Sequence, residues 1–201
     1  MTRTVKHARG VAAGALCAAA AATLLGCVEA VIVGGAATTA YVAADRRAAE
    51  VVAGDERISL TASSEIGNRL SDRAHVNVTS YNSNVLLTGE VPDAKTKAEA
   101  ERIALGVKQV KGVVNELQVA GASSLASRGN DTYLTGKVKA AMVSENKVAA
   151  NVVKVVTEAG VVYLLGIVTR READDATKIA RSVGGVQKVV RVFEYLAKPP
   201  R

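Results

Sequence analysis

Apolar residues recur along this 201-residue chain with two spacings, and the order of the spacings is repeated. Runs of β-branched and other apolar residues at 76–79 and 85–91 are matched by runs at 153–156 and 162–168. The offset between the copies is 77 residues through these runs and 76 residues after them. Self-similarity at a fixed spacing indicates one structural unit used twice.

Each copy predicts the same elements in the same order. Two apolar runs joined by turn residues, at 82–84 and 159–160, predict a β-hairpin in each copy. A helix is expected before each hairpin and another after it, because apolar residues recur there three and four positions apart. The positions expected to face the core are Ala62, Ile66, Leu70, Ala100, Ile103, Ala104 and Val107 in the first copy, and Leu134, Val138, Met142, Ala176, Ile179, Ala180 and Val183 in the second.

The second helix of each copy carries a start signal. Asp93 directly follows Pro92, and Thr169 precedes Glu172 by three residues, which is the spacing of a capping box. A closing strand is expected after each of these helices. Because the chain runs strand, helix, strand, we expect a crossover that returns to the same sheet.

These elements predict an α+β fold made of two tandem αββαβ domains. Each domain is expected to form a small mixed three-stranded sheet covered by two helices. The first domain is placed at 58–120, with its last strand at 113–119. A linker at 121–129 leads to the second domain at 130–198, whose last strand is expected at 189–196.

The N-terminus has the composition of a secretion signal. Three basic residues fall within the first nine positions, and residues 10–25 are an apolar stretch too short to span a bilayer comfortably. Leu24-Leu25-Gly26-Cys27 resembles a lipobox, with leucine at 25 where alanine or serine is more usual. We therefore expect a signal peptide at 1–26 and a palmitate-bearing lipid group on Cys27. The alternative is an ordinary signal or uncleaved anchor with a chance cysteine.

The segment after the cysteine is interpreted as a tether. Residues 28–44 are small and apolar but too few to cross a bilayer, and residues 45–57 are charged. The tether is thus placed at 27–57, with a Gly/Ala helix packed on a partner as the alternative. The chain has a net charge of +7, of which residues 58–119 contribute 0 and residues 127–201 contribute +6. The basic second domain favours an anionic partner.

Residues for catalysis or metal binding are scarce. Cys17 would leave with the signal and Cys27 would carry lipid, so no thiol remains for a disulfide, a metal or a nucleophile. After the signal, His75 is the one histidine, which argues against a histidine triad or a His/Cys metal cluster. We predict no enzyme activity, no cofactor, no metal and no small-molecule substrate. Gly89 and Gly166 are expected to serve backbone conformation or close packing.

The αββαβ pattern with Gly89 and Gly166 resembles the BON family, a bacterial module associated with osmotic-stress and envelope proteins. The lipobox, Asp45-Arg46-Arg47 in the tether and Asn130-Asp131-Thr132 at the start of the second domain extend the resemblance to lipoproteins with two such domains. This resemblance implies location at the periplasmic face of the outer membrane, contact with phospholipid, upkeep of the membrane barrier and no catalysis. Nucleic acid is not expected, since the anchor puts the chain in the wrong compartment and the sequence has no Trp and one Phe to stack bases.

One helix, at 132–143, has a second apolar stripe opposite its core-facing one. A helix already buried on one side has no structural need for it, and lysines at the edge of an apolar stripe suit a membrane interface. At an offset of 72 the first copy has polar residues there, namely Thr61, Ser64, Asn68 and Ser71. The predicted phospholipid-binding residues are Tyr133, Gly136, Lys137, Lys139, Ala140 and Val143.

The sequence therefore predicts a lipid-anchored protein whose second domain binds anionic phospholipid. Two alternatives remain open. Tyr133 could pack against the other domain or the linker instead of facing lipid. The chain could also act as an adaptor that docks an envelope assembly or a cell-wall enzyme complex through the first domain or the domain junction.

Overall fold

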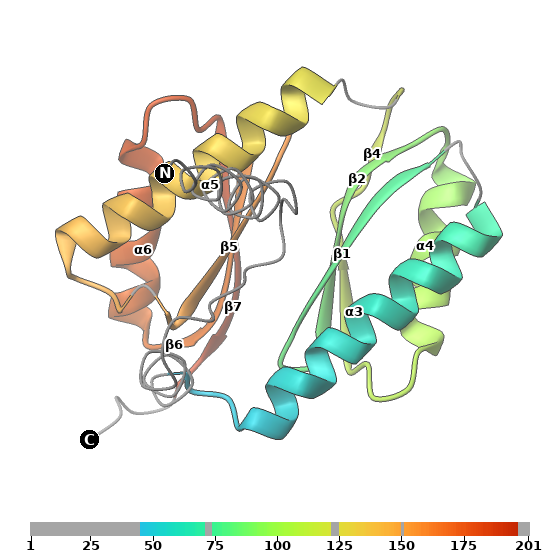
Figure 1. Cartoon of the computed structure of the whole chain (residues 1–201), viewed down its shortest axis with the longest axis horizontal. Coiled ribbons are helices and arrows are strands. Elements are labelled where there is room, and N and C mark those ends of the chain that lie inside the picture. Colours follow the sequence, from blue (N-terminus) through green and yellow to red (C-terminus); the bar gives the residue numbers. More distant parts are fainter. Residues whose placement is uncertain (1–44, 71–73, 122–124, 150, 197–201) are drawn as a thin grey trace, which may run out of the picture. The chain divides into compact units, whose positions relative to one another are not determined.

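A computed structural model of the chain shows two αββαβ units (Figure 1). The expected signal peptide and Cys27 lie outside the described residues. No helix in the described part of the chain is both long and apolar enough to cross a bilayer. The described residues are 45–70, 74–121, 125–149 and 151–196.

The first domain is built around a central strand. Strand β2 pairs antiparallel with β1, with Val78 opposite Leu87, and parallel with β3 and β4. The helices α3 and α4 cover one face of this sheet (Figure 1). The bounds are α3 Ala49–Leu70, β1 His75–Tyr81, β2 Asn84–Val91, α4 Ala94–Gly106, β3 Gly112–Asn115 and β4 Gln118–Val119.

The second domain repeats this plan with an unbroken last strand. Strand β6 is central, antiparallel to β5 and parallel to β7. The helices α5 and α6 lie on one face of the sheet (Figure 1). The bounds are α5 Leu125–Glu145, β5 Val153–Glu158, β6 Val161–Val168, α6 Arg170–Ser182 and β7 Lys188–Tyr195. The α+β class and the tandem αββαβ order are thus confirmed.

The first helix of each domain begins earlier than its apolar spacing indicates. Helix α3 starts at Ala49, inside the segment 27–57 that was interpreted as tether, and α5 starts at Leu125, inside the expected linker 121–129. The structure shows why the charged start of α3 belongs to the domain: Asp55 is buried there, 4% exposed, and holds the hairpin turn. The burial of a polar residue such as Asp55 cannot be predicted from the spacing of apolar residues.

The closing strand of the first domain is interrupted, where the sequence predicted one strand at 113–119. The ladder stops after Asn115, whose Oδ1 accepts the N–H of Leu117 at 3.3 Å. Leu117 is buried among the core residues of this domain. Pairing resumes at Gln118, opposite Glu90, so β4 continues the same register.

Both hairpins turn through two residues with positive φ. These are Asn82 (51°) and Ser83 (66°) in the first domain, and Ala159 (48°) and Gly160 (75°) in the second. Two-residue turns with positive φ match the right-handed twist of paired strands. The turns predicted at these positions are therefore present.

The second helices start where their caps predict. Asp93 accepts the N–H of Thr96 at 2.7 Å and lies directly before α4. Thr169 and Glu172 form a reciprocal capping box at the start of α6. Each cap satisfies N–H groups that the first turn of a helix leaves without partners.

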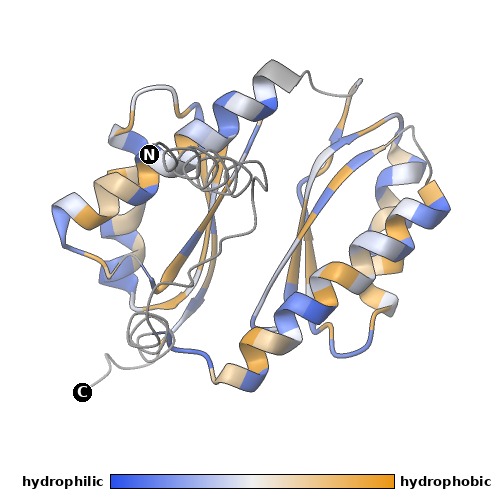
Figure 2. Cartoon of the chain, in the orientation of Figure 1, coloured by the Kyte–Doolittle hydropathy of each residue, from blue (hydrophilic) through white to orange (hydrophobic). Residues whose placement is uncertain are grey.

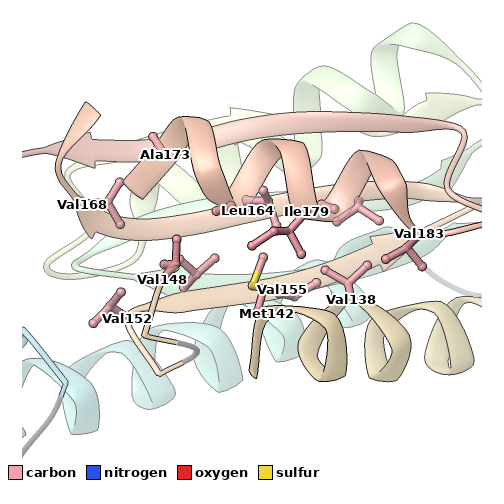
Figure 3. Packing of buried hydrophobic residues seen from close by; sticks show 14 residues of the cluster. Val138, Met142, Val148, Val152, Val155, Leu164, Val168, Ala173, Ile179 and Val183 are labelled. Carbon is pink, nitrogen blue, oxygen red and sulfur yellow. The ribbon is translucent and has the colours of Figure 1, made fainter. Parts of the chain in front are cut away.

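Each domain has an apolar core between its helices and its sheet. In the second domain Met142 and Val138 of α5 meet Val155, Leu164 and Ile179 from the sheet and α6 (Figure 3). Polar and apolar bands alternate along the helices in Figure 2, as one buried and one exposed face require. Of the predicted core positions all are buried except Leu70, which is half-buried.

A third apolar cluster joins the two domains. Tyr81 and Leu86 of the first domain pack with Tyr163 and Leu165 of the second, and all four are at most 5% exposed. These side chains project from the sheet faces opposite the helices, since successive strand residues point to opposite faces. The central strands β2 and β6 are consequently buried on both faces, and the two domains share an apolar contact.

Candidate functional site

The outer face of α5 carries two large apolar side chains in water. Tyr133 is 64% exposed and Val143 is 65% exposed. The opposite side of the same helix contributes Leu134, Val138 and Met142 to the core at 0–1% exposure. The exposure of Tyr133 argues against the alternative in which it packs on the other domain or the linker.

Two lysines lie beside these side chains. Lys137 Nζ lies 5.4 Å from the centre of the Tyr133 ring and donates to the carbonyl oxygen of Gly184 at 2.9 Å. Lys139, two residues further along the helix, is exposed. Gly136 and Ala140 are also exposed, and a Cβ at Gly136 would meet no atom within 4 Å. Five of the six predicted residues are thus exposed, and the sixth, Lys137, is half-buried beside Tyr133.

The structure changes which residues of α3 correspond to this face. A buried carboxylate on each first helix accepts the N–H groups of its own hairpin turn. Asp55 bonds Asn82 N and Ser83 N at 2.7 Å, and Asp131 bonds Ala159 N and Gly160 N at 2.9 and 2.8 Å. The equivalent positions are therefore 76 residues apart. The buried pairs Ile58/Leu134, Ala62/Val138 and Ile66/Met142 share this spacing.

The offset of 72 used to compare the two first helices is thus wrong by one helical turn. At the correct offset Tyr133 corresponds to Arg57, and Gly136 corresponds to Leu60, which is 63% exposed. The remaining counterparts of the face are polar or small: Thr61, Ser63, Ser64 and Gly67 for Lys137, Lys139, Ala140 and Val143. The contrast between the helices is therefore a tyrosine, a valine and two lysines against one leucine and one arginine.

The residues before α3 contact the second domain. Arg46 donates to both carboxylate oxygens of Glu172, at 2.6 and 2.9 Å, and to the carbonyl oxygen of Ile167 at 2.7 Å. The hydrogen bonds from Arg46 lower the pKa of Glu172 to about 2, helped by the N–H and hydroxyl of Thr169. The capping box of α6 is thus joined to the segment before the first domain.

Arg47 extends this network into the first domain. Its guanidinium lies 2.7 Å from a carboxylate oxygen of Asp45 and 2.8 Å from one of Asp55, and 4.0 Å above the Tyr81 ring. Burial alone would raise the pKa of Asp45, but hydrogen bonds from Arg47 lower it below its usual value. The sequence analysis placed these charged residues in the tether because of their composition. The spacing of apolar residues gives no information about their ion pairs.

A polar cleft of about 520 Å³ lies between the domains. Residues 76–79 of β1 and 155–158 of β5 form its walls, and both are edge strands. His75 and Glu158 line it, and with Glu90 they offer ligand atoms that all lie within 4.8 Å of one another. The residues of this cluster come from both domains, so no local sequence motif predicts it.

Gly89 and Gly166 both lie where the neighbouring backbone is too close for a side chain, and Gly89 also has a positive φ. Gly89 has φ +113°, and a Cβ there would lie 2.0 Å from the carbonyl oxygen of His75. At Gly166 a Cβ would lie 2.5 Å from the carbonyl oxygen of Val152. Both positions therefore exclude a side chain because the neighbouring backbone comes too close.

These features define two small α/β modules that share one plan, with an exposed apolar and basic face on α5 and a polar cleft at their junction. The model of the BON domain matches twice, at residues 54–121 and 130–197. The chain therefore belongs to the BON-domain family. These two matches cover most of the described residues and correspond to the two structural units.

Curated relatives agree with this assignment. The chain is 40% identical over 175 residues to outer membrane lipoprotein DolP of Haemophilus influenzae, covering 86% of this chain and 90% of that protein. It is 32% identical over 142 residues to a 21 kDa hemolysin of Actinobacillus pleuropneumoniae, covering 71% and 72%. It is 36% identical over 108 residues to osmotically-inducible protein Y of Escherichia coli, covering 52% and 54%.

Proposed function

We propose that this chain is an outer-membrane lipoprotein, anchored through Cys27 at the periplasmic face. Its second BON domain binds anionic phospholipid and so supports the integrity of the membrane. The similarity to outer membrane lipoprotein DolP of Haemophilus influenzae supports the location, and the lipobox-like residues 24–27 support the anchor. The role is one of binding rather than catalysis.

The observation that carries the lipid contact is the exposed pair Tyr133 and Val143 beside lysines on a helix already buried on its other side. An aromatic ring with a polar tip favours the headgroup level of a bilayer. A lysine near an anionic leaflet contributes on the order of 1 kcal/mol. Both contributions are small, but an anchor that holds the domain near the membrane makes a weak contact sufficient.

Vesicle flotation of residues 28–201, which lack the cysteine, tests the lipid contact. We expect binding to vesicles rich in anionic phospholipid, weakening as salt rises because screening reduces the attraction of the lysines. Tyr133→Ser should reduce binding about tenfold at any salt, since it removes apolar contact area. Lys137→Glu with Lys139→Glu should remove the preference for anionic lipid.

A matched control is available in the first domain. Leu60→Ser removes an exposed apolar side chain at the position equivalent to Gly136, and it should leave binding unchanged. Equal losses from Leu60→Ser and Tyr133→Ser would assign the contact to general apolar exposure and contradict the proposal. Unaltered binding in a folded Tyr133→Ser variant would contradict it as well.

A second candidate function, docking of a protein, is favoured by the polar cleft. Its walls are the edge strands β1 and β5. Edge strands present backbone N–H and C=O groups to which an extended peptide can add. Substitutions in the cleft that abolish a protein contact and leave flotation intact would support this second function.

A further inference from the structure

The cleft between the domains has the edge strands β1 and β5 as its walls. Each wall contributes four consecutive residues, 76–79 and 155–158. Among the described strands, β1 pairs with β2 alone and β5 pairs with β6 alone. Both walls therefore present to the cleft the edge that is not paired within their own sheet.

The hairpin turn decides which backbone groups of β1 point into the cleft. Tyr81 is paired with the residue just after the two-residue turn, so these two residues bond each other through their N–H and C=O groups. Such bonding alternates along an antiparallel pair, so the backbone groups of Val76 and Val78 point away from β2. Ser80 agrees with this alternation, because its N–H donates to Ser59 Oγ on α3 at 2.9 Å.

The same reasoning applies to β5. Glu158 is paired with the residue just after its own two-residue turn, so Val155 and Thr157 direct their N–H and C=O groups away from β6. The even-numbered residues of β6, which include the partners of these two, bond toward β7 instead. The 2.9 Å hydrogen bond from Leu196 N to the carbonyl oxygen of Val168 shows this direction.

Two rows of outward backbone donors and acceptors thus face one cleft. An extended chain placed between them can bond to both, because its own N–H and C=O groups point alternately to either side. A strand rises about 3.3 Å per residue, so walls of four residues match an added segment of about four residues. The volume of about 520 Å³ also falls within the usual range of binding pockets.

The composition of the two walls favours the addition of a strand. Natural edge strands often carry charged side chains, which discourage pairing with other chains. Strand β7, the other edge of the second sheet, follows this rule with Lys188, Arg191 and Glu194. Residues 76–79 and 155–157 have no charged side chain. The edges at the cleft are therefore not protected by charge.

The side chains around the cleft indicate the chemistry of the added segment. Three residues with hydroxyl groups line the cleft from the helices: Ser63 of α3 and Thr132 and Thr135 of α5. Asn77 Nδ2 donates to Glu158 Oε2 at 2.6 Å and so connects the two walls through polar groups. Serine and threonine in a bound segment can exchange hydrogen bonds with such a lining, whereas a large apolar side chain finds no matching surface.

We propose that the cleft binds an extended, hydroxyl-rich segment of a partner protein, which adds as a strand between β1 and β5 and joins the two sheets. The proposal rests on the second candidate function, docking of a protein, and is independent of the lipid contact. Its affinity comes from backbone hydrogen bonds to four outward residues, Val76, Val78, Val155 and Thr157. The bound segment would also hold the two domains together, since it bonds to both.

A short peptide of alternating threonine and serine tests the site on the full chain, purified in detergent. Amide hydrogen exchange followed by NMR is the measurement. Without peptide, the amides of Val76 and Val78 should exchange faster than those of Asn77 and Thr79, because only the latter two bond to β2. With peptide at about 1 mM, exchange at the four outward amides should slow about tenfold.

Matched pairs isolate the backbone hydrogen bonds. The same peptide, methylated at every second amide nitrogen, keeps its side chains but loses its donors to one wall, and it should bind about tenfold more weakly. Val78→Pro removes the outward N–H while leaving the ladder to β2 intact, and it should weaken binding about fivefold. Val78→Ala keeps that N–H and should bind as the unsubstituted chain does. Thr157→Pro and Thr157→Val form the equivalent pair on β5.

Three results would overturn the proposal. The peptide at about 1 mM could leave exchange at the outward amides of the unsubstituted chain unchanged. The methylated peptide could bind as tightly as the parent peptide. The folded proline variants could bind the peptide as their controls do. Vesicle flotation reports the lipid contact separately, and it should be unchanged in the proline variants because neither position lies on the exposed face of α5.

Discussion

The first helices of the two domains, α3 and α5, are alike where they face inward and different where they face outward. Each buries three apolar residues at matching positions and one carboxylate that holds the hairpin turn. Outward, α5 presents Tyr133, Val143 and two lysines, whereas α3 presents Leu60 and Arg57. The repeated inner face preserves the fold, and the outer faces are free to take different partners.

The two carboxylates at the turn show that even the shared inner face is used differently. Asp131 accepts two backbone N–H groups of its turn. Asp55 accepts two as well, and also the Ser80 hydroxyl at 2.6 Å and Arg47 at 2.8 Å. The first domain thus uses its turn carboxylate to hold the segment that reaches across to Glu172.

The largest loss of stability should come from removing the carboxylate on the first helix that holds the hairpin turn. Asp55→Ala should lower the free energy of unfolding by about 3–5 kcal/mol, because the turn N–H groups and the Ser80 hydroxyl lose their acceptor and the half-buried Arg47 keeps only Asp45 as its carboxylate partner. Asp131→Ala should cost about 1–3 kcal/mol, since only backbone donors lose a partner. Urea unfolding followed by circular dichroism measures both. Asp93→Ala, which removes an exposed helix cap, serves as a control at about 1 kcal/mol. Equal costs for Asp55→Ala and Asp131→Ala would contradict the added role of Asp55.

Low pH should weaken the ion pair between Arg46 and Glu172, with an intermediate effect on the free energy of unfolding. The pKa of Glu172 is about 2, against an ordinary value of 4.5. Its charge therefore stabilises the folded chain at pH values above 4.5, and this stabilisation is lost as the pH falls toward 2. The contribution is on the order of 2–3 kcal/mol. Unfolding measured in urea at several pH values should show the loss.

Arg46→Ala sharpens the acid prediction. Without the guanidinium the pKa of Glu172 should rise toward its ordinary value, so less stability remains to be lost between pH 4.5 and pH 2. Arg171→Ala is the matched control, because that side chain is 93% exposed and lies 3.9 Å from Asp175. An unchanged acid profile in Arg46→Ala would show that the link does not hold the domains in solution.

The smallest effect should follow from making the outer faces more alike. Thr61→Lys with Ser63→Lys places lysines on α3 at the positions of Lys137 and Lys139. Because each lysine near an anionic leaflet contributes on the order of 1 kcal/mol, flotation with anionic vesicles should strengthen a few-fold. Neutral vesicles should bind as before. A gain on neutral vesicles would show that the substitutions act through the fold rather than through charge.

Much of the fold could be predicted from local pattern. The hairpin turns, the caps at Asp93 and Thr169 and the core positions of α4 and α6 lie where the sequence placed them. Turn, cap and apolar spacing each act over a few residues, so each can be interpreted without the rest of the chain. The exposed face of α5 followed from the same reasoning.

Register between the copies could not be settled in this way. Ala62, Ile66 and Leu70 repeat at four-residue intervals, and so do Ile58, Ala62 and Ile66. A shift of one helical turn keeps a residue on nearly the same face, and periodicity alone cannot detect it. The buried Asp55 decides the register, because its carboxylate has to reach a particular hairpin turn.

By itself, then, the sequence determined that the chain is a repeat of one α/β unit and which side of most helices faces inward. Only the tertiary structure decided that Arg46 and Arg47 belong to ion pairs, that the two sheets share an apolar cluster and that His75 meets Glu90 and Glu158. The physical reason is distance along the chain. Local periodicity records one buried face per element, whereas contacts between domains join residues that no short pattern relates.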